Sequence, residues 1–173
     1  MTPTLETRRL RLTPLDPSDA GEMVSVLGDD QLYVFTGGRP PTLAELEERY
    51  RAQSAGSPSE GESWHNWIIR LVEDGVSVGF VQATVTGEEA EIARLVGVDW
   101  QGRGFATEAA TAMVEWLATS GKRRLVAHIP PDHAASGKVA AALGLLPTGE
   151  VDFDGEAIWG LITSGIRRSD QFP

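Results

Sequence analysis

Residues 98–110 read VDWQGRGFATEAA, and this stretch decides the fold. Its first residues close an apolar strand, two glycines follow in a turn, and a long helix begins. Gly102 and Gly104 allow a tight turn with positive φ and let a ligand approach the backbone closely. The helix start then presents unpaired N–H groups at the positive end of its dipole. The pattern predicts a pyrophosphate-binding turn, although a Gly-x-Gly pair alone is also typical of an ordinary turn.

Other phosphate-binding loops fit this sequence less well. A dinucleotide-binding fingerprint that begins at Gly102 requires glycine at position 107, where the chain has Thr107. A P-loop requires Ser or Thr after Gly-Lys, but Gly137-Lys138 is followed by Val139. A dinucleotide-binding oxidoreductase is therefore disfavoured, and the strand meander before the turn disfavours it further.

Outward from the turn, hydrophobic periodicity and turn residues divide the chain into strands and helices. We expect strands at 5–15, 67–72, 76–85, 90–98, 124–129, 146–152 and 156–162, and helices at 16–27, 42–53, 106–117 and 134–143. Thr42 and Glu45 have capping-box spacing, Gly144 is a helix stop, and Asp154-Gly155 is typical of a type I′ hairpin. This order predicts an α/β (α+β) fold, a mixed, twisted sheet of about seven strands flanked by helices.

Composition limits the class of protein further. A length of 173 residues fits one domain over 1–173, and the absence of cysteine excludes disulfides, thiolate metal sites and cysteine nucleophiles. The net charge of −10 argues against nucleic acid as a partner and mildly favours a cationic one, although solubility is the simpler explanation. No apolar stretch is long enough for a membrane span, and there is no secretory signal, so we expect a cytoplasmic protein.

Several ordered motifs together resemble the GNAT acetyltransferase superfamily. Gln101-Gly102-Arg103-Gly104-Phe105-Ala106 matches its Gln/Arg-x-x-Gly-x-Gly/Ala signature, and Thr107-Glu108-Ala109 extends the match to the RimJ/RimL-like branch. The opening Leu5–Leu12, Trp67-Ile68-Ile69 and Val78-Gly79-Phe80 resemble its first three strands. His133-Ala134-Ala135-Ser136 with Leu143-Gly144-Leu145 resembles its later Asn-x-x-Ser…Leu-Gly-Phe motif. The likeness covers nearly the whole chain.

The resemblance implies acetyl-CoA as cosubstrate. Backbone amides of residues 103–106 then hold the pyrophosphate, while the pantetheine arm pairs with one strand where the fourth and fifth strands splay apart. The implied cofactor-binding residues are Val96, Val98, Gln101, Gly102, Arg103, Gly104, Phe105, Ala106, Thr107, His133 and Ser136. Arg103 either contacts phosphate or is an ordinary surface residue, and histidine at 133, in place of the usual asparagine, puts that contact in question.

Acetyl transfer to an amine requires removal of a proton from the amine, polarisation of the thioester carbonyl and stabilisation of the leaving thiolate. Glu91 lies at the position of the family's strand glutamate and is the candidate base; otherwise it is an exposed strand residue, as we expect of Glu88 and Glu89. The family's usual tyrosine is replaced by Ala140, so Ser136 is the candidate for assisting the thiolate. The alternative for Ser136 is capping of the helix at 134–143, a role that Asp132 also fits.

The sequence indicates fewer residues for binding the acceptor amine than for binding the cofactor. Tyr33, Phe35 and Trp64 are candidates for lining an acceptor pocket, with ordinary packing as the alternative. No regular ligand spacing joins His128, Asp132 and His133, so we expect no metal. We expect an N-acetyltransferase that acts on a primary amine and, by analogy, forms a homodimer. The rival is a non-catalytic acyl-CoA-binding sensor or scaffold, motivated by Ala140 and His133.

Overall fold

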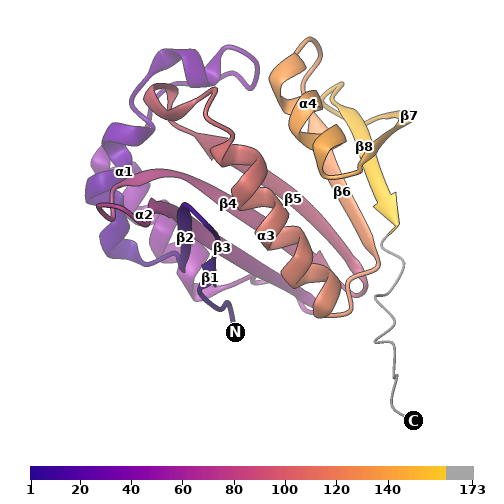
Figure 1. The fold of residues 1–173 in the computed structure, drawn as a ribbon, viewed down its shortest axis with the longest axis horizontal. Helices are drawn as coiled ribbons and strands as arrows, with labels where there is room; N and C mark the ends of the chain where they lie inside the picture. The colour runs from indigo at the N-terminus through magenta and orange to yellow at the C-terminus, as the bar shows by residue number, and fades with distance from the viewer. Residues whose placement is uncertain (163–173) are drawn as a thin grey trace.

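Alternating apolar residues build one eight-stranded sheet with helices on both faces (Figure 1). The computed structural model describes residues 1–162. The strands are β1 (Leu5–Glu6), β2 (Leu10–Pro14), β3 (Glu62–Leu71), β4 (Ser77–Thr86), β5 (Glu89–Val96), β6 (Arg124–Ile129), β7 (Leu146–Val151) and β8 (Ala157–Ile162). The helices are α1 (Ala20–Val26), α2 (Leu43–Ala55), α3 (Phe105–Thr119) and α4 (Ala134–Ala142). The strand order is β1-β2-β3-β4-β5-β6-β8-β7.

Two buried clusters lie on opposite faces of this sheet. The larger one joins α3 to the sheet through Ala109, Met113 and Leu117, which recur at helical spacing. The smaller one packs α1 and α2 on the other face, around Met23 and Leu46. In Figure 1, α3 and α4 lie in front of the sheet, and α1 and α2 lie on its far side. The predicted mixed sheet with helices on both faces is confirmed.

Local signals fix several element boundaries. Thr42 caps α2 as predicted: its hydroxyl accepts a bond from the Glu45 N–H, and the Glu45 carboxylate accepts one from the Thr42 N–H at 2.8 Å. Gly144 follows α4 with a φ of 84°, the left-handed conformation in which glycine ends a helix. Capping chemistry is local, which is why sequence alone predicts it well.

The prediction of one first strand at 5–15 was wrong, and the sheet has eight strands rather than about seven. Leu5 pairs with Leu12, so the segment folds into a hairpin, and the Thr7 N–H donates to the Leu10 carbonyl at its turn. Two further boundaries differ from expectation. A 3-10 turn at Pro17–Asp19 precedes α1, and β3 begins at Glu62 because its polar first residues also pair with β4.

The prediction of a type I′ turn between the last two strands was also wrong. That turn requires positive φ at both central residues, but only Gly155 has it, at 81°, and Asp154 does not. Instead the Gly155 N–H donates to the Asp152 carbonyl, and the Asp152 N–H donates to the Glu156 carbonyl. The connection is therefore a type I turn followed by a left-handed glycine.

The predicted splay is present between β5 and β6. These parallel strands pair only through Glu89 with Arg124, Ala90 with Leu125, and Glu91 with Val126. Beyond Glu91 the two strands diverge, although β5 continues to Val96 and β6 to Ile129. Because the first strand is divided, the fourth and fifth strands of the expectation are β5 and β6 of the structure.

Candidate acetyl-CoA site

The turn predicted to bind pyrophosphate has the backbone that this role requires. Gly102 and Gly104 have φ values of 75° and 81°, and Gly104 is the N-cap residue of α3. No side chain caps this helix end. The Glu108 N–H donates to the Gly104 carbonyl, so the amides of residues 105–107 precede the first intrahelical hydrogen bond. These amides, at the positive end of the helix dipole, fit an anionic pyrophosphate.

The turn is held by a bracket, defined here as the contacts of Thr7 and Arg9 with Glu108. The Glu108 carboxylate accepts bonds from the Thr7 hydroxyl at 2.6 Å and from the Arg9 N–H at 2.9 Å, and it ion-pairs with the Arg9 guanidinium at 2.6 Å. The same guanidinium donates to the Arg103 carbonyl and lies over the Phe105 ring. Arg9 therefore fixes the turn from outside.

Electrostatics favour the charged form of the Glu108 carboxylate. Burial alone would raise the pKa of Glu108, but the hydrogen bonds from Thr7 and Arg9 lower it below its ordinary value. No expectation from the sequence included this role. The sequence did contain the residues that form the bracket. Thr7 and Arg9 belong to one family motif and Glu108 to another, about a hundred residues later, and nothing in the sequence connects the two motifs.

Other predicted residues of the turn contribute backbone or support. The Gln101 amide donates to the Val96 carbonyl at 3.0 Å, which ties the turn to the end of β5. Arg103 is exposed and donates to the Asp99 carbonyl, so its side chain reaches solvent beside the turn. Phe105 is only 8 % exposed and belongs to the core rather than to a ligand surface. Ala106 and Thr107 lie in the first turn of α3.

The gap where β5 leaves β6 extends from this turn towards α4. Val96 ends β5 beyond the last β5–β6 pair, so it lies on the strand that a pantetheine arm would lengthen. Val98 lies in the 3-10 turn after β5 and lines a hollow beside α1. On the other side, Ser136 lies in the first turn of α4. The Arg94 side chain crosses between the sides, because its Nη2 donates to the Ser136 carbonyl at 2.7 Å.

The structure does not support capping as the role of Ser136 or Asp132. The N-cap residue of α4 is His133, and it makes no side-chain capping bond. Asp132 has a φ of 65° and lies outside the helix. Within residues 1–162 the Ser136 hydroxyl has no hydrogen-bond partner, so it is available to a ligand. His133 stacks on Phe35 with ring centroids 4.3 Å apart, and burial, then the Arg94 charge, lower its pKa.

Glu91 lies where β5 and β6 last pair, on the sheet face opposite α3. In the sheet register Trp64, Thr84, Glu91 and Val126 form one row across β3, β4, β5 and β6. The Glu91 side chain is exposed, so it lies in solvent rather than in a partly dry cleft. The register nevertheless places this carboxylate at the apex of the splay.

The three residues expected at the acceptor pocket differ in position. Trp64 shares the row of Glu91 and donates its indole N–H to Glu62 at 2.8 Å. Phe35 contacts the gap through His133, from the segment between α1 and α2. Tyr33 donates its hydroxyl to the Leu27 carbonyl, and burial raises its pKa, which indicates a packing role. The structure therefore brings Trp64 and Phe35 to the region of the gap, and Tyr33 supports the loop.

Three ionisable residues gather where β6 meets the last hairpin. Ligand atoms of His128, Asp152 and Glu156 lie within 4.8 Å of one another, and the His128 Nδ1 is 2.6 Å from the Asp152 carboxylate. The main-chain N–H of Glu156 and the contact with His128 lower the pKa of Asp152, whereas burial and the neighbouring Asp152 raise the pKa of Glu156. Asp152 also accepts main-chain N–H bonds inside the hairpin, which gives the cluster a structural role.

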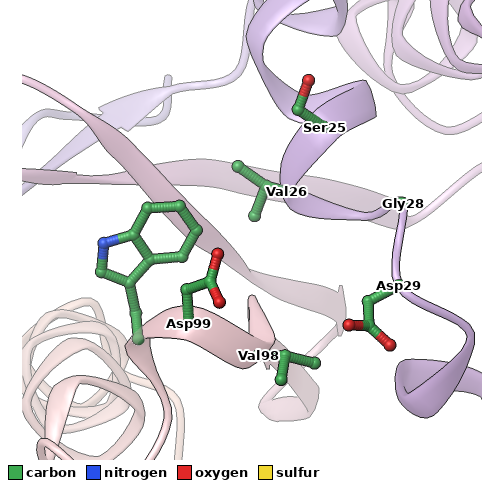
Figure 2. A pocket seen from close by; sticks show the side chains of 7 residues that line it. Ser25, Val26, Gly28, Asp29, Val98 and Asp99 are labelled. Carbon is green, nitrogen blue, oxygen red and sulfur yellow. The ribbon is translucent and has the colours of Figure 1, made fainter.

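A hollow of about 270 Å³ lies on the far side of the turn, between the end of α1 and the segment after β5. Figure 2 shows the carboxylates of Asp29 and Asp99 at its border, with Val26 and Val98 on its walls. Val96 lies five positions beyond Glu91 on β5, roughly 17 Å of extended chain. The hollow therefore lies too far from Glu91 to hold a reacting amine. No motif in the sequence predicted it.

A glycine turn that opens a helix, next to two parallel strands that diverge, defines a coenzyme A-dependent acyltransferase class. The model of the acetyltransferase (GNAT) domain matches residues 9–146, and the chain belongs to the GNAT acetyltransferase family. As a member of this family, the enzyme is an acetyl-CoA-dependent N-acetyltransferase.

Solved structures agree with this assignment. An acetyltransferase from Agrobacterium tumefaciens is 26% identical, with a TM-score of 0.75 over 94% of this chain and 96% of that one. RimL, a ribosomal L7/L12 alpha-N-protein acetyltransferase in complex with coenzyme A, is 14% identical, with a TM-score of 0.77 over 94% and 99%. Microcin C7 self-immunity acetyltransferase MccE, in complex with acetyl-CoA and AMP, is 15% identical, with a TM-score of 0.75 over 91% and 94%.

Among curated proteins, no sequence matches the chain. None of the helices within residues 1–162 is long and apolar enough to cross a membrane.

Proposed function

We propose that the protein moves the acetyl group of acetyl-CoA directly to a primary amine: a protein N-terminus, an amino acid or another small amine. The observation that carries this proposal is the alignment of the turn at 102–106 with the β5–β6 gap. Glu91 lies at the apex of this gap, and Ser136 lies on its α4 side. One extended ligand can reach from the turn to both residues.

In the proposed reaction the neutral amine attacks the thioester carbonyl carbon, whose electron pair moves to oxygen. Backbone N–H groups of β5 that face the gap are suited to stabilise this oxygen. The carbonyl then re-forms, the C–S bond breaks, and its electron pair leaves on sulfur. Glu91 accepts the amine proton, directly or through one water, and the Ser136 hydroxyl donates to the sulfur. No covalent enzyme intermediate is needed, which agrees with a chain that has no cysteine.

The function is tested by thiol release from acetyl-CoA with a panel of amines. We expect release that depends on the added amine and equals the acetylated product formed. The rival function, a non-catalytic acyl-CoA sensor or scaffold, rests on Ala140, which is buried where the family's tyrosine would stand, and on His133. Tight acetyl-CoA binding without release for every amine would establish the sensor instead.

Replacing Ser136 with alanine tests the proposed role of its hydroxyl. We expect a fall in kcat of about tenfold with little change in acetyl-CoA affinity, because the variant loses a donor to the developing thiolate. The measurement is steady-state kinetics combined with calorimetric titration. A capping residue would instead cost about 1 kcal/mol of stability with kcat unchanged, and that result would remove Ser136 from the reaction.

We also propose that the acceptor carries positive charge. The net charge of −10 supports this, because it attracts cations at long range. The KM of the best acceptor should rise with sodium chloride between about 0.01 M and about 1 M, because the Debye length falls from roughly 30 Å to roughly 3 Å. A neutral or acidic best acceptor with a salt-independent KM would contradict this proposal.

A homodimer remains a prediction. Exposed apolar residues on the β7–β8 hairpin support it, since large apolar side chains at a sheet edge are typical of contact surfaces: Leu146, Val151, Phe153 and Ile162. One domain over 1–173 likewise remains a prediction, and residues 163–173 lie outside the part that the structure describes.

A further inference from the structure

Arg94 is the one arginine within residues 1–162 that is shielded from solvent and has no carboxylate partner. The comparable Arg70 is paired with Asp19 at 2.7 Å and with Glu22 at 2.8 Å. The other arginines without an ion pair, Arg8, Arg49 and Arg103, are exposed. A shielded charge is costly to leave uncompensated, and burial lowers the pKa of Arg94.

The hydrogen bonding of Arg94 is also incomplete. A guanidinium carries five N–H donors, and residues 1–162 provide one acceptor for them, the Ser136 carbonyl at 2.7 Å from Nη2. This single bond orients the group but leaves its charge without a counter-ion. An anion beside Arg94 and Ser136 would satisfy both the charge and the remaining donors.

The position of Arg94 indicates which anion this is. Arg94 lies on β5 three residues beyond the last β5–β6 pair, and strand alternation places it with Ile92 and Val96 on the face of α3 and α4. Its side chain therefore crosses the gap to the first turn of α4. Ser136 lies in the first turn of that helix, so its hydroxyl lies near the helix end at which the dipole is positive.

We propose that Arg94 stabilises the coenzyme A thiolate as it leaves, a role that rests on the proposed acetyl transfer. When the C–S bond breaks, its electron pair moves to sulfur, and the guanidinium and the Ser136 hydroxyl stabilise the new negative charge. The thiolate later takes a proton from solvent. Arg94 thereby supplies the stabilisation that the buried Ala140 cannot provide in place of a tyrosine.

The test measures the thiol pKa of bound coenzyme A from the ultraviolet absorbance of the thiolate during a pH titration. In the wild-type complex this pKa should lie at least about 1 pH unit below that of free coenzyme A, the usual effect of a nearby opposite charge. Arg94→Gln should abolish most of this difference, and Arg94→Lys should keep part of it. Arg49→Gln removes an exposed guanidinium from α2, on the other face of the sheet, and is the matched control, with the wild-type thiol pKa.

Kinetics provide the second readout. Arg94→Gln should lower kcat by about 10- to 100-fold with little change in coenzyme A affinity, because the charge acts on the leaving group. An unchanged thiol pKa in Arg94→Gln overturns the proposal, and so does a loss confined to acceptors that carry a carboxylate. If Arg94→Lys and Arg94→Gln lower kcat equally and both lower the melting temperature, Arg94 only holds α4 in place. That result would also overturn the proposal.

These outcomes are separable from failure of the proposed function. If the wild-type protein binds coenzyme A but transfers no acetyl group to any amine, the acetyltransferase proposal fails. The thiol titration still reports on Arg94 in that case, since it requires only the bound thiol.

Discussion

Gly104→Glu should weaken acetyl-CoA binding by about 100-fold or more, roughly 2.7 kcal/mol, in a protein that still folds. Gly104 has a φ of 81°, a conformation that costs a residue with a side chain about 1–2 kcal/mol. Its Cβ would lie 3.4 Å from the Arg9 Nη2, so the new carboxylate would compete with Glu108 for that guanidinium. It would also place negative charge beside the amides that face the pyrophosphate.

Gly121→Glu is the matched control for this prediction. Gly121 has the same φ of 81°, lies after the opposite end of α3, and a Cβ at this position would meet no atom within 4 Å. Both variants therefore gain one negative charge and similar backbone strain, but only one gains them at the turn. Calorimetric titration should show near wild-type affinity for Gly121→Glu. Equal affinities in two folded variants would exclude the turn as the cofactor site.

Glu91→Gln should lower kcat at pH 7 by about 10²–10⁴-fold while acetyl-CoA affinity changes little. An alkylammonium is almost fully protonated at pH 7, so the attacking lone pair is scarce until a base takes the proton. Glutamine keeps the shape of the side chain and removes its basicity. Activity should recover partly at high pH, where free amine becomes available. The measurement is the pH dependence of kcat for both proteins.

Glu89→Gln tests whether any carboxylate on β5 would show such an effect. Glu89 is exposed, lies two residues from Glu91 on the same face of the strand, and pairs with Arg124 at 3.3 Å. Exposed pairs contribute little, so its replacement should be nearly neutral. Glu88→Gln, which loses a similar exposed pair with Arg123, should behave alike. Wild-type kcat in Glu91→Gln would show that the base lies elsewhere or that solvent deprotonates the amine.

The parts of the fold predicted correctly depend on local physics. The glycine turn, the α2 capping box and the end of α4 each follow from a few adjacent residues, and the structure has all three. The first strand was mispredicted because the chain turns back at Thr7, whose N–H donates to the Leu10 carbonyl. The alternation of apolar residues predicts a strand but not a turn within it. The last hairpin was mispredicted because Asp-Gly is compatible with more than one turn type.

The parts of the site that were missed depend on contacts between distant segments. Arg94 looks like an ordinary strand residue until β5 leaves β6 and α4 lies across the gap. The hollow of Figure 2 joins α1 to the segment after β5, and no single motif contains both. Glu91 was chosen because its position matches the family's strand glutamate. The structure places it at the apex of the splay, and its role as the base stays a prediction.

The bracket of Thr7, Arg9 and Glu108 has a consequence for how the chain matures. Its partners are 101 and 99 residues apart, so residues 7–9, which are synthesised well before α3, cannot form these bonds until α3 has followed them. Closing so long a loop is entropically costly, and contacts of high sequence separation slow folding. The part of the site that would bind the pyrophosphate is therefore completed late in synthesis, even though Gly102 and Gly104, which shape its turn, are only two positions apart in the sequence.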